Sequence, residues 1–121
     1  TLVTYSATTQ VALEVAKQLK EEVSIEVVDL RTLNPLDRKA IVKSVRKTGR
    51  MVTTEQGCRT CGVGAELVAV VMEQCFDSLK SPIERVAAED SAFPAIRALK
   101  EYMTVGAQQI AAAINRSMGS A

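Results

Sequence analysis

The most recognisable chemical signals in the sequence are a pair of cysteines, Cys58 and Cys61, and the glycine-rich segment that follows them. Both lie within residues 55–67, EQGCRTCGVGAEL. Two thiols at this spacing can form a disulfide or supply two ligands to a metal, and the backbone N–H groups of a glycine-rich turn before a helix can bind phosphate. A turn that only reverses the chain has the same composition. The rest of the sequence must distinguish these interpretations.

Metal and dinucleotide sites are not favoured at this segment. A structural zinc site needs four ligands, but the chain has no histidine, and Cys75 falls on an apolar stripe where a cysteine behaves as a small hydrophobe. Gly62 and Gly64 match the start of a dinucleotide fingerprint, but Leu67 stands where its third glycine belongs. Phosphate binding at the start of the following helix and a redox role for Cys58 and Cys61 stay open as alternatives.

The elements that must position the turn follow an alternating pattern. Short β-branched runs alternate with longer segments of helical periodicity, which is typical of a layered α/β domain. Strands are expected at residues 1–6, 24–30, 50–55 and 83–88. The segment of interest therefore connects the third expected strand to a helix.

Helical periodicity and capping residues predict four helices. Thr8 or Thr9 is expected as the N-cap of the first, and the second is expected to begin after Asp37 and to stop at Gly49. The third has the longest apolar stripe. The expected inward positions are Val11, Leu13, Val15, Ala16 and Leu19; Ala40, Ile41 and Val45; Leu67, Val68, Val71, Met72, Cys75, Phe76 and Leu79; and Ile110, Ile114 and Met118.

Length and composition limit the function classes. The 121 residues, of which 47% are hydrophobic, suit a single domain over residues 1–121 with one sizeable core. A net charge of +1 and the absence of tryptophan disfavour nucleic acid as a partner, and no apolar run is long enough to span a membrane. Because histidine, the usual base at neutral pH, is missing, we expect no complete active site within this chain.

Three stretches together indicate a family. They are SIEVVDLRTLNPLDRKAIVKSVRKTGR, EQGCRTCGVGAEL and SPIERVAAEDSAFP, which begin at residues 24, 55 and 81. They resemble the C-terminal domain of the β subunit of thiamine-diphosphate-dependent 2-oxo acid dehydrogenases, nearest to pyruvate dehydrogenase, over nearly the whole chain. The resemblance implies an α/β fold of the transketolase C-terminal domain type. In this fold a three-layer α/β/α sandwich surrounds a mostly parallel, five-stranded sheet with one antiparallel strand.

The resemblance also implies a non-catalytic role. The whole enzyme decarboxylates pyruvate and passes the acetyl unit to a lipoyl group, while this domain supports subunit association and docking onto the lipoyl acyltransferase core. Thiamine diphosphate and magnesium would be held by other domains, with no catalytic, cofactor-binding or metal-binding residue in this chain. The implied partners are the α subunit, a second β subunit and the acyltransferase core. The implied compartment is the mitochondrial matrix in a eukaryote or the cytoplasm in a bacterium, and no targeting segment is visible.

Candidate contact residues follow from one departure from the family pattern. Relatives often have an acidic residue two positions before the proline that precedes the fourth strand, but this chain has Lys80 there. We therefore expect either that docking at Lys80 uses other nearby acids, such as Asp77 or Glu84, or that the core partner differs. For self-association, the apolar residues between 93 and 103 do not fit one helix face, so we expect Phe93 or Tyr102 at a contact between copies.

Two kinds of alternative remain. The chain can be the same domain of a branched-chain 2-oxo acid dehydrogenase, an acetoin dehydrogenase or a deoxyxylulose-phosphate synthase, since substrate choice is implied to reside in other domains. It can also be an independent thiol-redox module that uses Cys58 and Cys61. Against the second alternative, family members usually carry glycine at the position of Cys61, so the family interpretation makes the cysteine pair incidental.

Overall fold

Four parallel strands form the sheet at the centre of the molecule. The computed structural model describes residues 1–92 and 104–119, and the strands are β1 (Leu2–Thr4), β2 (Val27–Asp29), β3 (Val52–Cys58) and β4 (Glu84–Ala88). Their order is β2-β1-β3-β4, and every neighbouring pair is parallel. The expected fifth, antiparallel strand is not among the described residues. Each connection between successive strands contains a helix that carries the chain back to the same edge, so the next strand runs in the same direction.

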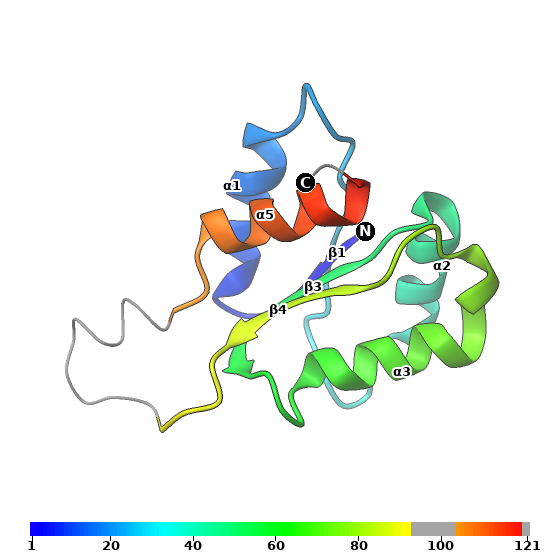
Figure 1. The fold of residues 1–121 in the computed structure, drawn as a ribbon. Helices are drawn as coiled ribbons and strands as arrows, with labels where there is room; N and C mark the ends of the chain where they lie inside the picture. Colours follow the sequence, from blue (N-terminus) through cyan, green and yellow to red (C-terminus); the bar gives the residue numbers. More distant parts are fainter. Residues whose placement is uncertain (93–103, 120–121) are drawn as a thin grey trace.

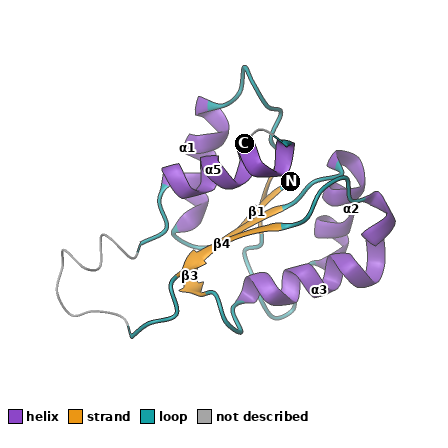
Figure 2. Cartoon of the chain, in the orientation of Figure 1, coloured by secondary structure: helices purple, strands orange, loops and turns teal. Residues whose placement is uncertain are grey.

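Helices cover both faces of this sheet. They are α1 (Thr8–Gln18) and α5 (Ala107–Met118) on one face, and α2 (Arg38–Thr48) and α3 (Val63–Cys75), followed by the 3₁₀ turn η1 (Phe76–Ser78), on the other. Figure 1 shows the two pairs on opposite sides of the strands, and Figure 2 shows the same three layers by type of structure. The α/β/α sandwich expected from the resemblance is therefore confirmed.

Each face of the sheet has its own buried apolar core. Successive residues of a strand point to opposite faces, so the neighbours Leu2 and Val3 of β1 belong to different cores. The core beneath α2 and α3 includes Val3, Leu30, Ile41, Val45, Met51, Leu67, Val70 and Val71. The core beneath α1 and α5 includes Leu2, Ala12, Val15, Val52, Val86, Ile110 and Ile114.

The helix ends agree with the sequence-based expectation in one helix and differ in another. The Oδ1 atom of Asp37 accepts a hydrogen bond from the backbone nitrogen of Ala40 at 3.0 Å, and α2 ends at Gly49 with a left-handed φ of 75°. The prediction of a threonine N-cap for α1 is wrong. Ala7 occupies that position without a side-chain cap, and Thr8 is already buried in the first turn, where it donates a hydrogen bond to the carbonyl of Tyr5.

Several residues that were expected to point inward are exposed. Leu13 of α1 and Met72 of α3 are both 48% exposed, Phe76 is 57% exposed and Met118 is 42% exposed. In these helices, fewer apolar residues are buried than the apolar stripe in the sequence predicts. The excess residues of α3 and η1 therefore lie at the surface of the described structure.

Among the described residues, none of the helices combines the length and the apolar character needed to cross a membrane.

Candidate functional site at the carboxyl end of β3

The segment with the cysteines and glycines lies where a doubly wound sheet most often binds ligands. In such sheets the crevice forms beyond the carboxyl ends of the strands, at the point where the strand order reverses. Here that point lies between β1 and β3, because the chain leaves β1 for β2 on one side and returns to β3 on the other. Residues 59–61 form the turn that follows β3, and α3 begins directly afterwards.

A buried carboxylate occupies the start of α3. Glu55 is only 2% exposed, and its Oε1 atom accepts a hydrogen bond from the backbone nitrogen of Gly64 at 2.8 Å. The hydroxyl of Tyr5 donates to Oε2 at 3.3 Å. Burial raises the pKa of the Tyr5 phenol, and the negative charge of Glu55 raises it further. A carboxylate at this place is stabilised by the partial positive charge of the helix N-terminus.

The glycines of the segment make room for this carboxylate. A Cβ atom at Gly62 would lie 2.4 Å from the carbonyl oxygen of Cys58 and 2.8 Å from Oε1 of Glu55, and one at Gly64 would lie 2.7 Å from the same Oε1. The protein's own carboxylate therefore fills the position that an anion would take at the helix start. A phosphate there would meet a negative charge, so the structure does not favour a phosphate-binding loop.

The neighbouring side chain, Gln56, holds the other helical layer. Its Oε1 atom accepts a hydrogen bond from the backbone nitrogen of Val105 at 3.0 Å, and its Nε2 atom donates to the carbonyl of the same residue at 3.2 Å. The register between β3 and β4 is irregular here, since the five residues from Thr54 to Cys58 face the three residues from Val86 to Ala88 of β4. Glu55 and Gln56 thus secure the start of α3 and the segment before α5.

The turn itself is tied to the end of β4. Thr60 donates to the carboxylate of Asp90 through its backbone nitrogen (2.9 Å) and through its hydroxyl (2.5 Å), and the hydroxyl bond is the main cause of a lowered Asp90 pKa. Arg59 donates from its backbone nitrogen to the carbonyl of Ala88 at 3.1 Å. Cys58 and Cys61 are exposed and unbonded to each other.

The structure separates the three predicted docking residues. Asp77 lies exposed on η1, and Lys80 follows it, with its backbone nitrogen donating to the carbonyl of Gly49 at 2.8 Å. Glu84 instead accepts hydrogen bonds from Nε and Nη2 of Arg116 on α5, at 3.0 and 2.8 Å. Asp77 and Lys80 are thus close in sequence, in the segment that follows α3, while the Glu84 carboxylate is bonded to Arg116 on the α5 face. Phe93 and Tyr102 lie outside the described residues.

Beside Asp77 and Lys80 lies an apolar groove that sequence reasoning missed. It has a volume of about 430 Å³ and is lined by Val68, Met72, Phe76, Leu79, Ser81, Pro82 and Ile83. The spacing of four between Val68, Met72 and Phe76 was the available signal, but it was interpreted as a stripe facing the core. We call these seven residues the α3 groove.

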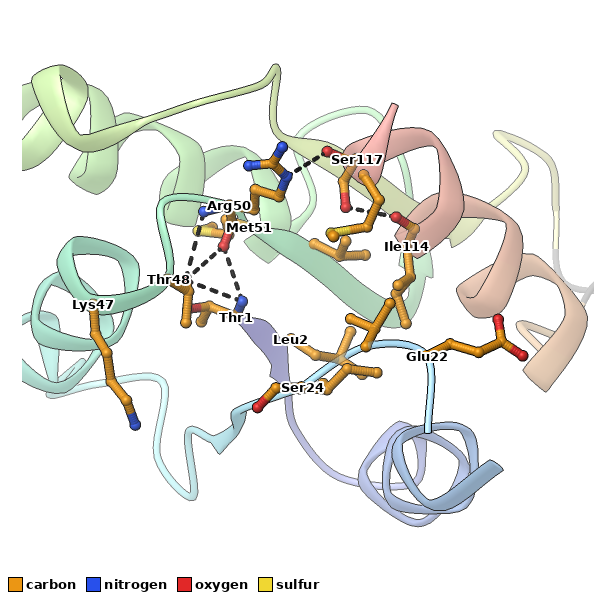
Figure 3. Close-up of a pocket in the computed structure, with 14 residues that line it drawn as sticks. Thr1, Leu2, Glu22, Ser24, Lys47, Thr48, Arg50, Met51, Ile114 and Ser117 are labelled. Carbon is orange, nitrogen blue, oxygen red and sulfur yellow. Dashed lines mark hydrogen bonds between the residues drawn. The ribbon is translucent and has the colours of Figure 1, made fainter. Parts of the chain in front are cut away.

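A second cavity lies at the opposite end of the strands, where β1 and β3 begin. The cavity has a volume of about 400 Å³, and its lining includes the apolar residues Leu2, Met51 and Ile114, which Figure 3 labels. Its main polar groups bond to one another, since Arg50 donates to the carbonyl of Ser117 at 2.8 Å. The figure shows no facing acid and base at its centre, and no cluster of three potential metal ligands occurs in the described parts of the chain.

Two relatives and one solved structure resemble the chain over most of its length. The mitochondrial pyruvate dehydrogenase E1 component subunit β of Dictyostelium discoideum is 40% identical over 117 residues, which are 96% of this chain and 33% of that protein. The 2-oxoisovalerate dehydrogenase subunit β of Pseudomonas aeruginosa is 46% identical over 94 residues, 78% of this chain and 26% of that protein. A solved structure described as a split gene transketolase, inactive β4 tetramer, has a TM-score of 0.82 at 31% identity, covering 98% of this chain and 37% of that one.

These matches agree in extent and in kind. The chain spans about a third of the Dictyostelium relative, 26% of the Pseudomonas relative and 37% of the solved structure. The family model for the transketolase C-terminal domain matches residues 1–110, which is most of the chain. The fold, the matched range and the relatives lead to one conclusion: the chain belongs to the transketolase C-terminal domain family.

Proposed function

We propose that residues 1–121 are the non-catalytic C-terminal domain of a β subunit of a thiamine-diphosphate-dependent pyruvate dehydrogenase. The observation that carries the proposal is the 40% identity over 96% of the chain to a pyruvate dehydrogenase E1 component subunit β. In this proposal the domain supports assembly with an α subunit and a second β subunit, and the complete enzyme decarboxylates pyruvate.

A second substrate class has support of its own. The 2-oxoisovalerate dehydrogenase subunit β is 46% identical to this chain, so the substrate can also be a branched-chain 2-oxo acid. The experiment is to produce the longer subunit that carries this domain together with its α subunit, and to measure decarboxylation of pyruvate and of 2-oxoisovalerate with thiamine diphosphate and magnesium. Faster turnover of pyruvate supports the first assignment. Turnover of neither 2-oxo acid contradicts both.

We expect the cofactor to bind outside this domain. The helix start at the glycine-rich turn is a place where a diphosphate could bind, but the Glu55 carboxylate already occupies it. A diphosphate would be repelled by that buried carboxylate. Calorimetric titration of the chain with thiamine diphosphate and magnesium should give no heat of binding, and micromolar binding would contradict this part of the proposal.

We propose further that the α3 groove docks the domain onto a binding segment of the acyltransferase core. Met72 and Phe76 give the groove an exposed apolar wall, and the segment that lines it also carries the exposed residues Asp77 and Lys80, one of each charge. A partner segment with an apolar residue between a basic and an acidic residue matches this arrangement. We expect Glu84 to contribute less to docking, because its carboxylate already forms an ion pair with Arg116 on another face.

A matched pair of variants tests the docking surface. Met72→Lys and Leu13→Lys each replace a side chain that is 48% exposed, but only Met72 lines the groove. We expect Met72→Lys to weaken binding to the acyltransferase core at least tenfold, measured by calorimetry, because a lysine charge must be desolvated in the contact. Leu13→Lys should bind as the wild type does. Equal affinities for the two variants would place the contact elsewhere.

Self-association and compartment complete the proposal. Contact between copies through Phe93 or Tyr102 stays a prediction, tested by sedimentation of the wild type against Tyr102→Ser. The relatives include mitochondrial proteins of eukaryotes and proteins of bacteria, so we expect the matrix or the bacterial cytoplasm according to the organism. Cell fractionation with an antibody against the chain checks the compartment.

A further inference from the structure

The two thiols of the turn take little part in holding it together. The turn is fixed through its middle residues, because Thr60 binds Asp90 through both its backbone nitrogen and its hydroxyl. Within the described structure, the one polar contact of the cysteine side chains is between Sγ of Cys58 and the carbonyl of Ser91. At 4.0 Å it is at the limit for a sulfur hydrogen bond. The thiol of Cys61 is exposed to solvent. Both sulfur atoms are therefore available for chemistry without loss of the turn.

Cys58 is the last residue of β3, and Cys61 is the last residue of the turn that follows it. A Cβ atom at Gly62 would lie 2.4 Å from the carbonyl oxygen of Cys58, so the chain after Cys61 returns against the end of β3. A disulfide requires the two Cα atoms to lie within about 7 Å, which two cysteines three positions apart reach only where the chain folds back between them. The contact between Gly62 and Cys58 shows that the chain does fold back within these residues, as a disulfide requires.

The backbone conformation at the second cysteine is unusual for a residue with a side chain. Cys61 has a φ of 57°, in the left-handed region, which costs a non-glycine residue about 1 kcal/mol. A glycine would adopt this conformation without that cost. The chain thus carries a thiol at a position where the backbone alone favours glycine.

The third cysteine has a different environment. Cys75 is buried in the core beneath α2 and α3, and burial raises the pKa of its thiol. A raised pKa lowers the fraction of reactive thiolate, and burial limits the approach of an oxidant. The three cysteines therefore divide into one exposed pair and one protected thiol.

We propose that Cys58 and Cys61 are a site of oxidative modification, at which a peroxide converts the two thiols into a reversible disulfide. One thiolate attacks a peroxide oxygen, an S–O bond forms and the O–O bond breaks. Hydroxide is the leaving group, and that cysteine becomes a sulfenic acid. The second thiol attacks this sulfur, the S–S bond forms, and the sulfenic oxygen leaves as water. Two thiols and one hydrogen peroxide thus give one disulfide and two waters, and a small dithiol reduces this disulfide back to two thiols while it becomes a disulfide itself. This inference does not depend on the proposed function.

The sequence offers a sharp test by trypsin digestion. Trypsin cleaves after Arg59, between the two cysteines, and the next cleavage sites put Cys58 and Cys61 on the separate peptides 51–59 and 60–80. The second peptide also contains Cys75, so the experiment uses the Cys75→Ala background. After treatment of the folded chain with hydrogen peroxide, we expect the two peptides to remain linked in the mass spectrum and to separate on reduction.

Matched variants decide the outcome. In Cys75→Ala, the loss of both remaining titratable thiols, restored by a dithiol, supports the proposal. In the wild type, two of its three thiols should be lost. Cys58→Ser and Cys61→Gly should give no linked peptides, and Cys61→Gly should fold at least as stably as the wild type when reduced. Separate peptides carrying sulfinic acids, or disulfides between two chains in place of the linked peptides within one chain, would overturn the proposal.

Discussion

The Oε1 atom of Glu55 lies 2.8 Å from the backbone nitrogen of Gly64, so a strand residue supplies the acceptor for the first turn of the following helix. This contact is buried, and the carboxylate also receives the Tyr5 hydroxyl. It links the end of β3 to α3 without a side-chain cap from the helix itself. The contact explains why the glycine-rich turn has a structural role in this chain.

Removal of the carboxylate should destabilise the fold. Glu55→Ala leaves the Gly64 nitrogen without its acceptor, which we expect to cost about 2 kcal/mol in the free energy of unfolding. Glu55→Gln keeps an acceptor oxygen and should cost less. Urea denaturation measures both, with Glu73→Ala on the exposed side of α3 as the control, expected within about 0.5 kcal/mol of the wild type. A Glu55→Ala protein as stable as the control would contradict this role.

A methyl group at Gly64 should also destabilise the fold. Its Cβ atom would lie 2.7 Å from Oε1 of Glu55, and the resulting displacement should cost about 1–3 kcal/mol despite the higher helix propensity of alanine. Gly106→Ala is the matched control, because its nearest heavy atom would be 3.7 Å away. Thermal denaturation compares the two variants. If Glu55 is the cause, Gly64→Ala should cost less in the Glu55→Ala background than in the wild type.

The titration of Tyr5 should report the same contact. Its pKa is raised, so the neutral phenol is favoured in the folded state, and its contribution to stability is present below the unfolded pKa and lost as the pH rises through the folded pKa. Tyrosinate absorbance should show one tyrosine that ionises late, and Tyr5→Phe should remove this component. Glu55→Gln should move it toward the ordinary pKa. Titration of Tyr5 at its ordinary value in the wild type would exclude the interaction.

The N-cap of α2 provides an independent check on a helix that the sequence delimited well. Asp37→Ala removes the acceptor of the Ala40 nitrogen and should lower the free energy of unfolding by about 1 kcal/mol. Asp77→Ala is the control, since this exposed aspartate gives no side-chain cap to the short η1 turn. Chemical denaturation measures the difference, and equal stabilities of the two variants would show that the cap contributes nothing.

The elements with strong local signals were predictable from the sequence. Asp37 and Gly49 mark the ends of α2 because a cap and a left-handed residue are local requirements, and both appear in the structure. The strands were expected from their β-branched runs, although β3 extends to Cys58, three residues beyond the expected end at residue 55. Its extension depends on pairing with β4, which no local pattern encodes.

The arrangement of the candidate site was less predictable. Glu55 was part of the quoted motif, but its buried contacts join it to Gly64 of α3 and to Tyr5, which follows β1 and lies 50 residues away in sequence. Met72 and Phe76 have helical spacing that a buried and an exposed apolar face share. Which of these residues are buried depends on the contacts that the helix makes in the fold, and the sequence pattern reports only that they share a side of the helix.

Because Glu55 and Gln56 are adjacent on β3, both helical layers are hydrogen-bonded to the same strand, and this affects how the molecule unfolds. One secures α3 on its face of the sheet, and the other secures the segment at Val105 that leads into α5 on the opposite face. Separation of either layer must therefore disturb the same strand. The amide hydrogens of α3 and α5 should exchange with solvent in one cooperative event, and neither layer should persist as a stable partly folded unit after the other has opened.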